Sequence, residues 1–231
     1  MQSPGLVIIP AQEFIPTIAA SAFLHLERPA GSHVQFNMVQ CTIASKRNAA
    51  VTLLLEHKQF EWLLMLDSDM RPLPDTLLRL LAHDRPIVSA LYRQKRPPFK
   101  FVAARADNGP LALDAGLQLV ESVGAGCILI RRAVLEALPG PHWFKANDQD
   151  ALEDVNFALA AAAAGFPVYV DTSLEVAHLT VAPIDSNWAL GDLFVRDESE
   201  RFDGVRGVAL VARGLAWEAN QPFHVDRPTQ A

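Results

Sequence analysis

Two carboxylates follow the clearest strand pattern in the sequence. Trp62–Leu66 is an unbroken run of five apolar residues, and Asp67, Ser68 and Asp69 come directly after it. Such a run is typical of a strand buried on both faces of a parallel sheet, and open α/β sheets bind ligands beyond the carboxyl ends of their strands. Mg²⁺ and Mn²⁺ prefer oxygen ligands. The pattern therefore favours a divalent-metal site at Asp67 and Asp69, with a solvated turn as the alternative.

A second pair of carboxylates, Glu153 and Asp154, stands at the head of an alanine-rich stretch that predicts a helix over 152–164. Asp150 precedes Glu153 by three residues, which fits a capping box with Asp150 as N-cap and Glu153 at N3. The cap would account for Glu153 without any catalysis. Asp154 has no part in the cap and is the better candidate for an active-site carboxylate.

Three further polar residues could take part in binding. His178 lies alone in apolar sequence just after a predicted strand, where a structural role is commoner than a ligand role. Arg47 and Asn48 open a predicted helix, and donors at such a position can meet a phosphate or a nucleobase. A solvated helix start is the alternative interpretation of this pair.

Residues 91–106 contain five cationic side chains and no acidic one, although the whole chain carries a net charge of -6. The cations are Arg93, Lys95, Arg96, Lys100 and Arg105. Three interpretations remain open: a solubilising surface loop, a clamp on a donor diphosphate, or a patch that receives an anionic acceptor. Cations at the rim of a site steer polyanions and make their binding salt-dependent.

Strands and helices must position these side chains. Apolar runs predict strands at 6–9, 34–39, 62–66, 87–91, 123–130 and 168–170, the fifth with a tight bend at its glycines. Helices are predicted at 15–26, 44–57, 133–138 and 152–164, and another is opened by Pro74 and Asp75. Alternating strands and helices up to about residue 92 indicate an α/β domain with a mostly parallel sheet.

Composition bounds the remaining possibilities. The chain has 231 residues, of which 50% are hydrophobic, so it can bury a large core and is not disordered as a whole. The acidic balance argues against nucleic-acid binding over the whole surface. Cys41 and Cys127 form no Cys-x-x-Cys pair, which disfavours a disulfide framework or a structural zinc site. No signal peptide or membrane-spanning run is apparent, and a cytoplasmic location is expected.

Taken together and in order, these segments resemble the GT-A glycosyltransferases, in particular the family 2-like group with small phage and bacterial members. The matching stretches are 46–49, 62–70 with 74–77, 87–92, 123–132, 142–144, 153–157 and 164–171, followed by His178. The resemblance covers about residues 5–180. The first strand ends in Pro10-Ala-Gln rather than the usual Pro-Thr-Tyr-like run, and 17–40 matches no motif. The expected organisation is a catalytic domain over 1–183 and an appendage over 184–231.

The resemblance implies a GT-A fold, with a Rossmann-like, mostly parallel sheet flanked by helices, and an inverting, metal-dependent sugar transfer. It implies a donor linked to uridine or guanosine diphosphate, Mn²⁺ or Mg²⁺ as cofactor, and an acceptor that is a glycan, a lipid-linked sugar or modified DNA. The implied metal ligands are Asp67, Asp69 and His178. Asp154 would be the general base, supported by Glu153. The implied donor-binding residues are Pro10, Arg47, Asn48, Asp67, Ser68 and Asp69. Gly124, Ala125 and Gly126 would let the acceptor approach the backbone, together with Trp143 and Arg93.

Other classes lack parts of their usual patterns. A nucleotidyltransferase would share the sheet and the carboxylates but usually needs a Gly-rich phosphate loop after the first strand, and 6–14 offers none. A non-catalytic relative that binds a sugar nucleotide or glycan would be expected to lose the metal or base carboxylates, and all are present. No complete Gly-x-Gly-x-x-Gly follows a strand, and no Gly-x-Ser-x-Gly occurs, which disfavours dehydrogenases and hydrolases.

Overall fold

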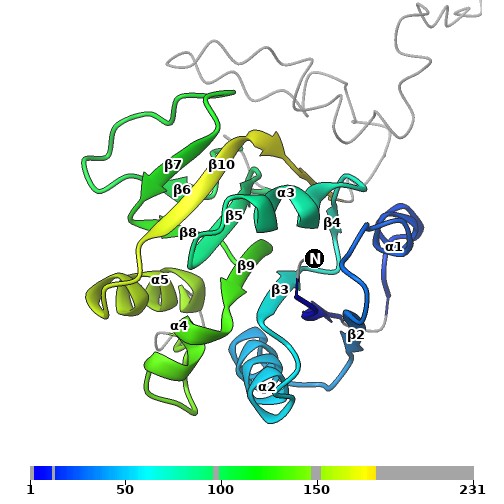
Figure 1. Cartoon of the computed structure of the whole chain (residues 1–231). Coiled ribbons are helices and arrows are strands. Elements are labelled where there is room, and N and C mark those ends of the chain that lie inside the picture. Colours follow the sequence, from blue (N-terminus) through cyan, green and yellow to red (C-terminus); the bar gives the residue numbers. More distant parts are fainter. Residues whose placement is uncertain (1–2, 12–13, 96–98, 147–151, 181–231) are drawn as a thin grey trace, which may run out of the picture.

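A seven-stranded sheet forms the centre of the molecule, with strand order β2-β1-β3-β9-β5-β10-β7 (Figure 1). The computed structural model describes residues 3–11, 14–95, 99–146 and 152–180, so the predicted appendage at 184–231 lies outside the described residues. The strands of this sheet are β1 (Leu6–Pro10), β2 (His33–Asn37), β3 (Trp62–Leu66), β5 (Ile87–Leu91), β7 (Leu117–Val120), β9 (Cys127–Arg131) and β10 (Val168–Glu175).

Five of these strands run in one direction, as the sequence predicts, but the sheet is mixed. β1 pairs in parallel with both β2 and β3, and β10 pairs in parallel with β5. β9 lies antiparallel between β3 and β5, and β7 lies antiparallel along β10. The alternation of strand and helix stops near residue 92, so no crossover helix turns the chain before β7 or β9. Without such a crossover, these strands enter the sheet from the opposite end.

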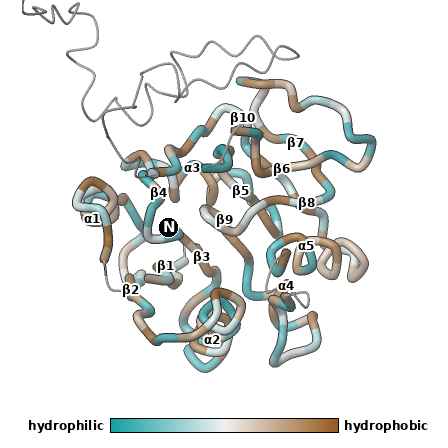
Figure 2. Tube along the Cα trace, turned by 180° about the vertical axis from the view of Figure 1, so that it is seen from behind, coloured by the Kyte–Doolittle hydropathy of each residue, from teal (hydrophilic) through white to brown (hydrophobic). Residues whose placement is uncertain are grey.

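Helices cover both faces of the sheet. They are α1 (Thr17–Leu24), α2 (Ile43–Glu56), α3 (Thr76–Ala82), α4 (Arg132–Ala137) and α5 (Glu153–Ala163). In β1, Leu6 and Ile8 pack in the cluster under α2, α4 and α5, whereas Val7 and Ile9 pack in the cluster under α1 and α3. Period-two alternation between two buried faces explains why the central strands are continuously apolar (Figure 2). Among the described residues, no helix is long and apolar enough to span a membrane.

The predicted strands at 62–66 and 87–91 are confirmed to the residue. The stretch 123–130, predicted as one bent strand, is instead two strands separated by a turn: β8 (Ser122–Val123) and β9. β8 pairs with β6 (Ala103–Ala104) in a separate two-stranded sheet. The turn between β8 and β9 therefore stands at the end of the central sheet, where β3 finishes.

A second small ladder, between β4 (Met70–Arg71) and β11 (Ala177–His178), closes the same end of the sheet. It pairs His178 with Met70, and the Leu179 backbone N–H donates to the Asp69 carbonyl at 2.8 Å. Both strands are only two residues long and carry no strand pattern in the sequence. This ladder places the histidine beside the residues that follow β3.

A buried carboxylate ties β10 to α3. Asp171 is 2% exposed; its Oδ1 accepts hydrogen bonds from the Ser173 backbone N–H and hydroxyl, and its Oδ2 lies 2.9 Å from His83 Nε2. Arg79 adds a longer contact at 3.8 Å. Burial alone would raise the pKa of Asp171, but these hydrogen bonds outweigh burial and hold the pKa below its usual value.

Replacing Asp171 with Asn should therefore lower the free energy of unfolding in a pH-dependent manner. At pH 7 the expected loss is about 2 kcal/mol, the usual worth of hydrogen bonds to a charged group. Because the folded pKa lies below the unfolded one, near 3.9, the stabilisation is complete above that value and disappears as the pH falls through the folded pKa. Urea unfolding at pH 7 and at decreasing pH measures the difference. Asp75→Asn, at an exposed position, is the matched control. If the difference in unfolding free energy between Asp171→Asn and the unaltered protein does not shrink as the pH falls, this account is contradicted.

Candidate functional site

The candidate site lies where the parallel strands end and the antiparallel strand β9 begins. β9 runs opposite to β3, so Leu66, the last residue of β3, pairs with Cys127, the first of β9. The Asp67 backbone N–H donates to the Gly126 carbonyl at 2.9 Å, which fixes the turn before β9 against the turn after β3. This edge of the sheet is the place where α/β proteins bind ligands.

Arg47, on α2, is a buried cation between two carboxylates. Its Nη2 donates to both oxygens of Asp67, at 3.1 and 3.3 Å, and its Nε lies 3.3 Å from Glu153 Oε1. Burial alone would lower the pKa of Arg47, but Asp67 and Glu153 outweigh it and raise the pKa. Burial in turn raises the pKa of Asp67, and Arg47 opposes this only in part. The guanidinium of Arg47 thus joins the end of β3 to the start of α5.

The predicted capping box at Glu153 is wrong. α5 begins at Glu153 itself, and the N-cap is Leu152, whose φ of 64° is left-handed. Glu153 is therefore the first residue of the helix rather than N3, and Asp150 lies outside the described residues. Glu153 is 7% exposed and its carboxylate faces Arg47. Burial raises the pKa of Glu153. Glu153 has a structural partner, although a different one from that predicted.

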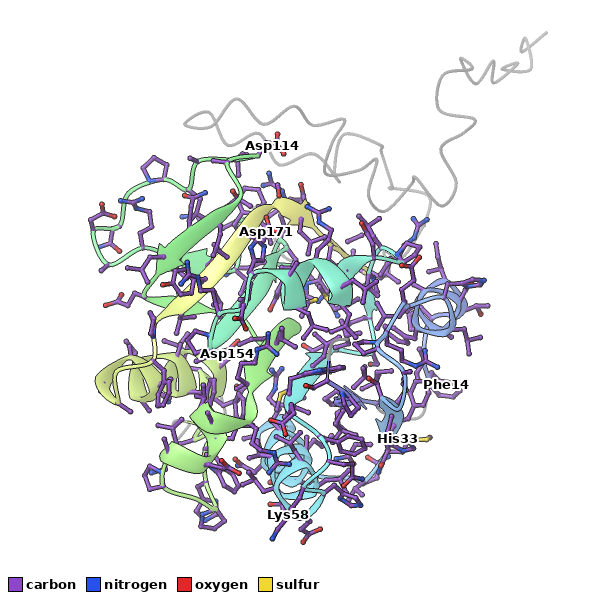
Figure 3. All side chains as sticks on the ribbon, in the orientation of Figure 1. Phe14, His33, Lys58, Asp114, Asp154 and Asp171 are labelled. Atoms are coloured by element: carbon purple, nitrogen blue, oxygen red, sulfur yellow. The ribbon has the colours of Figure 1, made fainter. Side chains whose placement is uncertain are left out.

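Asp154 is held by backbone N–H groups. Its Oδ1 accepts from its neighbour Val155 at 2.8 Å, and its Oδ2 accepts a long hydrogen bond from Ala125 at 3.3 Å. Figure 3 shows Asp154 near the start of α5, in the middle of the molecule. The first turn of a helix favours a negative charge. Asp154 is thus half-buried beside the turn before β9, with a carboxylate that makes no contact with Arg47 among those observed.

Asp69 and His178 face each other across the β4–β11 ladder. His178 Nε2 lies 3.4 Å from Asp69 Oδ1, which is buried and lacks a hydrogen bond of good geometry. His178 Nδ1 lies 2.8 Å from the Arg93 carbonyl and donates its proton there, so Nε2 is the ring nitrogen that could offer a lone pair to a metal ion. Asp69 Oδ2 pairs with the Lys95 ammonium. Burial alone would raise the pKa of Asp69, but His178 and Lys95 outweigh it and lower the pKa.

These two residues fit a divalent cation as a partial ligand set. Within the described ranges, no group of three His, Cys, Asp or Glu side chains is arranged to hold a metal ion. Mg²⁺, however, is typically held by one or two carboxylates together with substrate phosphates, and the unsatisfied Asp69 Oδ1 faces His178 Nε2. Asp67 is turned toward Arg47, and its role as a ligand stays a prediction.

Sequence reasoning missed Tyr92, which gives two of the predicted glycines a packing role. A Cβ on Gly124 would lie 2.0 Å from the Tyr92 hydroxyl oxygen, and one on Gly126 would lie 2.9 Å from it. The Gly126 N–H donates to this oxygen at 2.9 Å, and the His178 ring packs edge-on at 5.5 Å. Gly124 and Gly126 thus make room for a buried tyrosine, and the acceptor role of Gly124, Ala125 and Gly126 stays a prediction. The available signal was that Tyr92 directly follows β5.

Three other predicted binding residues have structural partners. The Asn48 amide donates to and accepts from the backbone of Phe144, at 2.9 Å each, and Trp143 Nε1 donates to the Leu135 carbonyl at 3.0 Å. The Arg93 guanidinium lies 3.8 Å from the Phe101 ring centroid and bonds the Phe99 carbonyl. The binding roles of Asn48, Trp143 and Arg93 stay predictions.

The roles of Pro10 and Ser68 stay predictions. Pro10 is buried at the end of β1, and Ser68 is half-buried in the turn after β3. The predicted basic patch does not form one surface among the described residues. Lys95 points to Asp69, whereas Arg105 pairs with exposed Asp107 at 2.7 Å. Arg96 lies outside the described residues.

Comparison with known proteins identifies the fold. No protein-family model and no curated protein matches this chain. Among solved structures, A197 from STIV matches with 21% identity and a TM-score of 0.60, covering 76% of this chain and 85% of that one. GalNAc-T7, in a structure with UDP, GalNAc and Mn²⁺, matches with 11% identity and a TM-score of 0.55. That match covers 76% of this chain and 44% of GalNAc-T7, so this chain spans less than half of it. TarS 1–349 from S. aureus also matches, with 13% identity, a TM-score of 0.48, and 72% and 57% coverage. The fold is that of GT-A glycosyltransferases, as the sequence predicts.

Replacing Arg47 with Met should strongly destabilise the protein. The change leaves the carboxylates of Asp67 and Glu153 without their common cation, and breaking a buried ion pair from one side costs about 3–5 kcal/mol. Urea unfolding at pH 7 measures this loss. Arg105→Met, which breaks an exposed ion pair, is the control and should change stability far less than Arg47→Met. Equal losses in the two variants would show that Arg47 does not have this linking role.

Proposed function

We propose that this protein is a glycosyltransferase that moves a sugar from a nucleotide-diphosphate donor to an acceptor hydroxyl. One observation carries the proposal: Asp69 Oδ1, buried and without a good hydrogen bond, faces His178 Nε2 at the ligand-binding edge of a GT-A sheet. A carboxylate and an imidazole arranged in this way suit a divalent cation that also binds phosphates. Asp154, at the start of α5, lies at the same edge and accepts a hydrogen bond from Ala125 in the turn that leads into β9.

The reaction needs charge stabilisation on one side and a base on the other. In the transfer, the acceptor oxygen bonds to the anomeric carbon, the bond from that carbon to the diphosphate oxygen breaks, and the acceptor hydroxyl loses its proton. Bound Mn²⁺ or Mg²⁺ would neutralise the charge that develops on the departing diphosphate. Asp69 and His178 would hold the cation, and Asp67, with Arg47 behind it, would lie on the donor side.

Asp154 is the proposed general base. Each of its oxygens accepts a hydrogen bond from a backbone N–H group, which fixes the carboxylate at the start of α5 where it can take the proton of an acceptor hydroxyl. Glu153 is a weaker candidate because its side chain faces Arg47. With a single base near the acceptor and no nucleophile assigned on the donor side, the proposed outcome is inversion.

The choice of donor and cofactor draws on GalNAc-T7, whose structure contains UDP, GalNAc and Mn²⁺. UDP with Mn²⁺ is therefore the first pair to test, and GDP is the second. The acceptor is proposed to be a glycan, a lipid-linked sugar or modified DNA. We also propose a cytoplasmic location, because both Cys41 and Cys127 are free thiols and a reducing compartment suits them.

Asp69→Ala should abolish Mn²⁺-dependent binding of UDP or GDP, because it removes the carboxylate that faces His178. In the unaltered protein, a ligand at 100 times its dissociation constant adds about 2.7 kcal/mol of stability, which thermal unfolding detects readily. Asp75→Ala, at an exposed position at the start of α3, is the control. Nucleotide binding that survives in Asp69→Ala, or that persists in excess chelator, would overturn the metal-dependent proposal.

Asp154→Asn should keep nucleotide binding and lose transfer. Loss of a positioned base lowers turnover by about 10²-fold or more. If the protein is instead a non-catalytic relative, the unaltered protein will bind nucleotide but show no turnover. The assay measures the free UDP that is released when the sugar is transferred to an acceptor or, more slowly, to water. The comparison is Glu153→Gln, which should be less stable because it weakens the contact with Arg47. An active Asp154→Asn with an inactive, folded Glu153→Gln would show that the two roles are reversed.

A further inference from the structure

The Lys95 ammonium contacts one oxygen of Asp69, the carboxylate that would bind the proposed metal. Lys95 Nζ pairs with Asp69 Oδ2, while the other oxygen of Asp69 faces His178. The side chains of Lys95 and Asp69 are 36% and 28% exposed, so this is a partly solvated ion pair. Ion pairs of this kind are weak, worth up to about 1 kcal/mol, and a competing cation can displace the ammonium.

The backbone near Lys95 is anchored to the same histidine that faces Asp69. His178 Nδ1 bonds the Arg93 carbonyl at 2.8 Å, two residues before Lys95. Just before Lys95, the Gln94 N–H donates to the Lys100 carbonyl at 2.8 Å, and Arg93 forms a β-bridge with Phe101. Lys95 therefore extends from a backbone position fixed next to the site, and only its flexible four-carbon side chain must move to release Asp69.

We infer that Lys95 and a divalent cation are alternative occupants of Asp69. The inference rests on the proposed function. With no metal bound, Lys95 neutralises Asp69 through Oδ2; when Mn²⁺ binds, the ammonium leaves the carboxylate. The displaced ammonium is next to the place where a metal-bound diphosphate would lie, and phosphate oxygens are its natural new partners. Lys95 thus weakens metal binding alone and strengthens nucleotide binding once metal is present.

Acylation of lysines with an N-hydroxysuccinimide acetate reagent, measured residue by residue by mass spectrometry, tests the exchange directly. An ammonium held by a carboxylate reacts slowly, so Lys95 should react faster once Mn²⁺ is added and slowly again with Mn²⁺ and UDP. Lys100 is an internal control on the same stretch, and Lys58 is a distant one (Figure 3). Lys95 reactivity that does not respond to Mn²⁺ at concentrations that bind would overturn the exchange. Reactivity that stays high with UDP would overturn the transfer to the diphosphate.

Calorimetry with Lys95→Met separates the two halves of the inference. Mn²⁺ alone should bind up to about fivefold more tightly, the equivalent of an ion pair of this exposure, whereas UDP in saturating Mn²⁺ should bind more weakly. Lys100→Met controls for the loss of a nearby positive charge and should change neither constant as much. Unchanged or weaker Mn²⁺ binding in Lys95→Met overturns the inference alone. Absence of Mn²⁺ binding in both proteins overturns the inference and the metal-dependent function together.

Discussion

The arrangement of the site depends on one buried cation. Arg47 comes from α2, on one face of the sheet, and contacts Asp67 after β3 and Glu153 at the start of α5. These three segments are distant in the sequence, and little else observed at this edge joins all of them. Burying two ionised carboxylates close together costs much less when a cation lies between them. The position of α5, and with it that of Asp154, is therefore linked electrostatically to the end of β3.

The antiparallel direction of β9 has an equally direct consequence for the site. A parallel strand at this place would begin at the far end of the sheet, and its preceding turn would lie away from Asp67. Because β9 begins where β3 ends, the turn of Gly124 to Gly126 reaches both Asp67 and Asp154 through backbone groups. The same turn receives the Tyr92 hydroxyl. One reversed strand thus connects the turn after β3 with the carboxylate of Asp154.

The sequence predicted what depends on local pattern. The apolar runs of β3 and β5 gave exact bounds because both faces of those strands are buried, and the acidic turn after β3 does lie at the edge of the sheet. Contacts between distant segments were not predictable in this way. Nothing near Asn48 indicates that its amide bonds the backbone of Phe144, 96 residues later. The capping-box pattern at Glu153 was a sound local signal, but the ion pair with Arg47 decided its place instead.

The glycines show how a residue type that suggests a binding site can also have a packing reason. Gly124 and Gly126 were expected to admit a substrate because a missing Cβ leaves space beside the backbone. The protein fills that space with Tyr92, whose ring also packs against His178. Burial raises the pKa of the tyrosine, so its hydroxyl stays protonated next to Asp67 and adds no further negative charge. Tyr92 is thus a neutral group packed between the turn before β9 and the ring of His178.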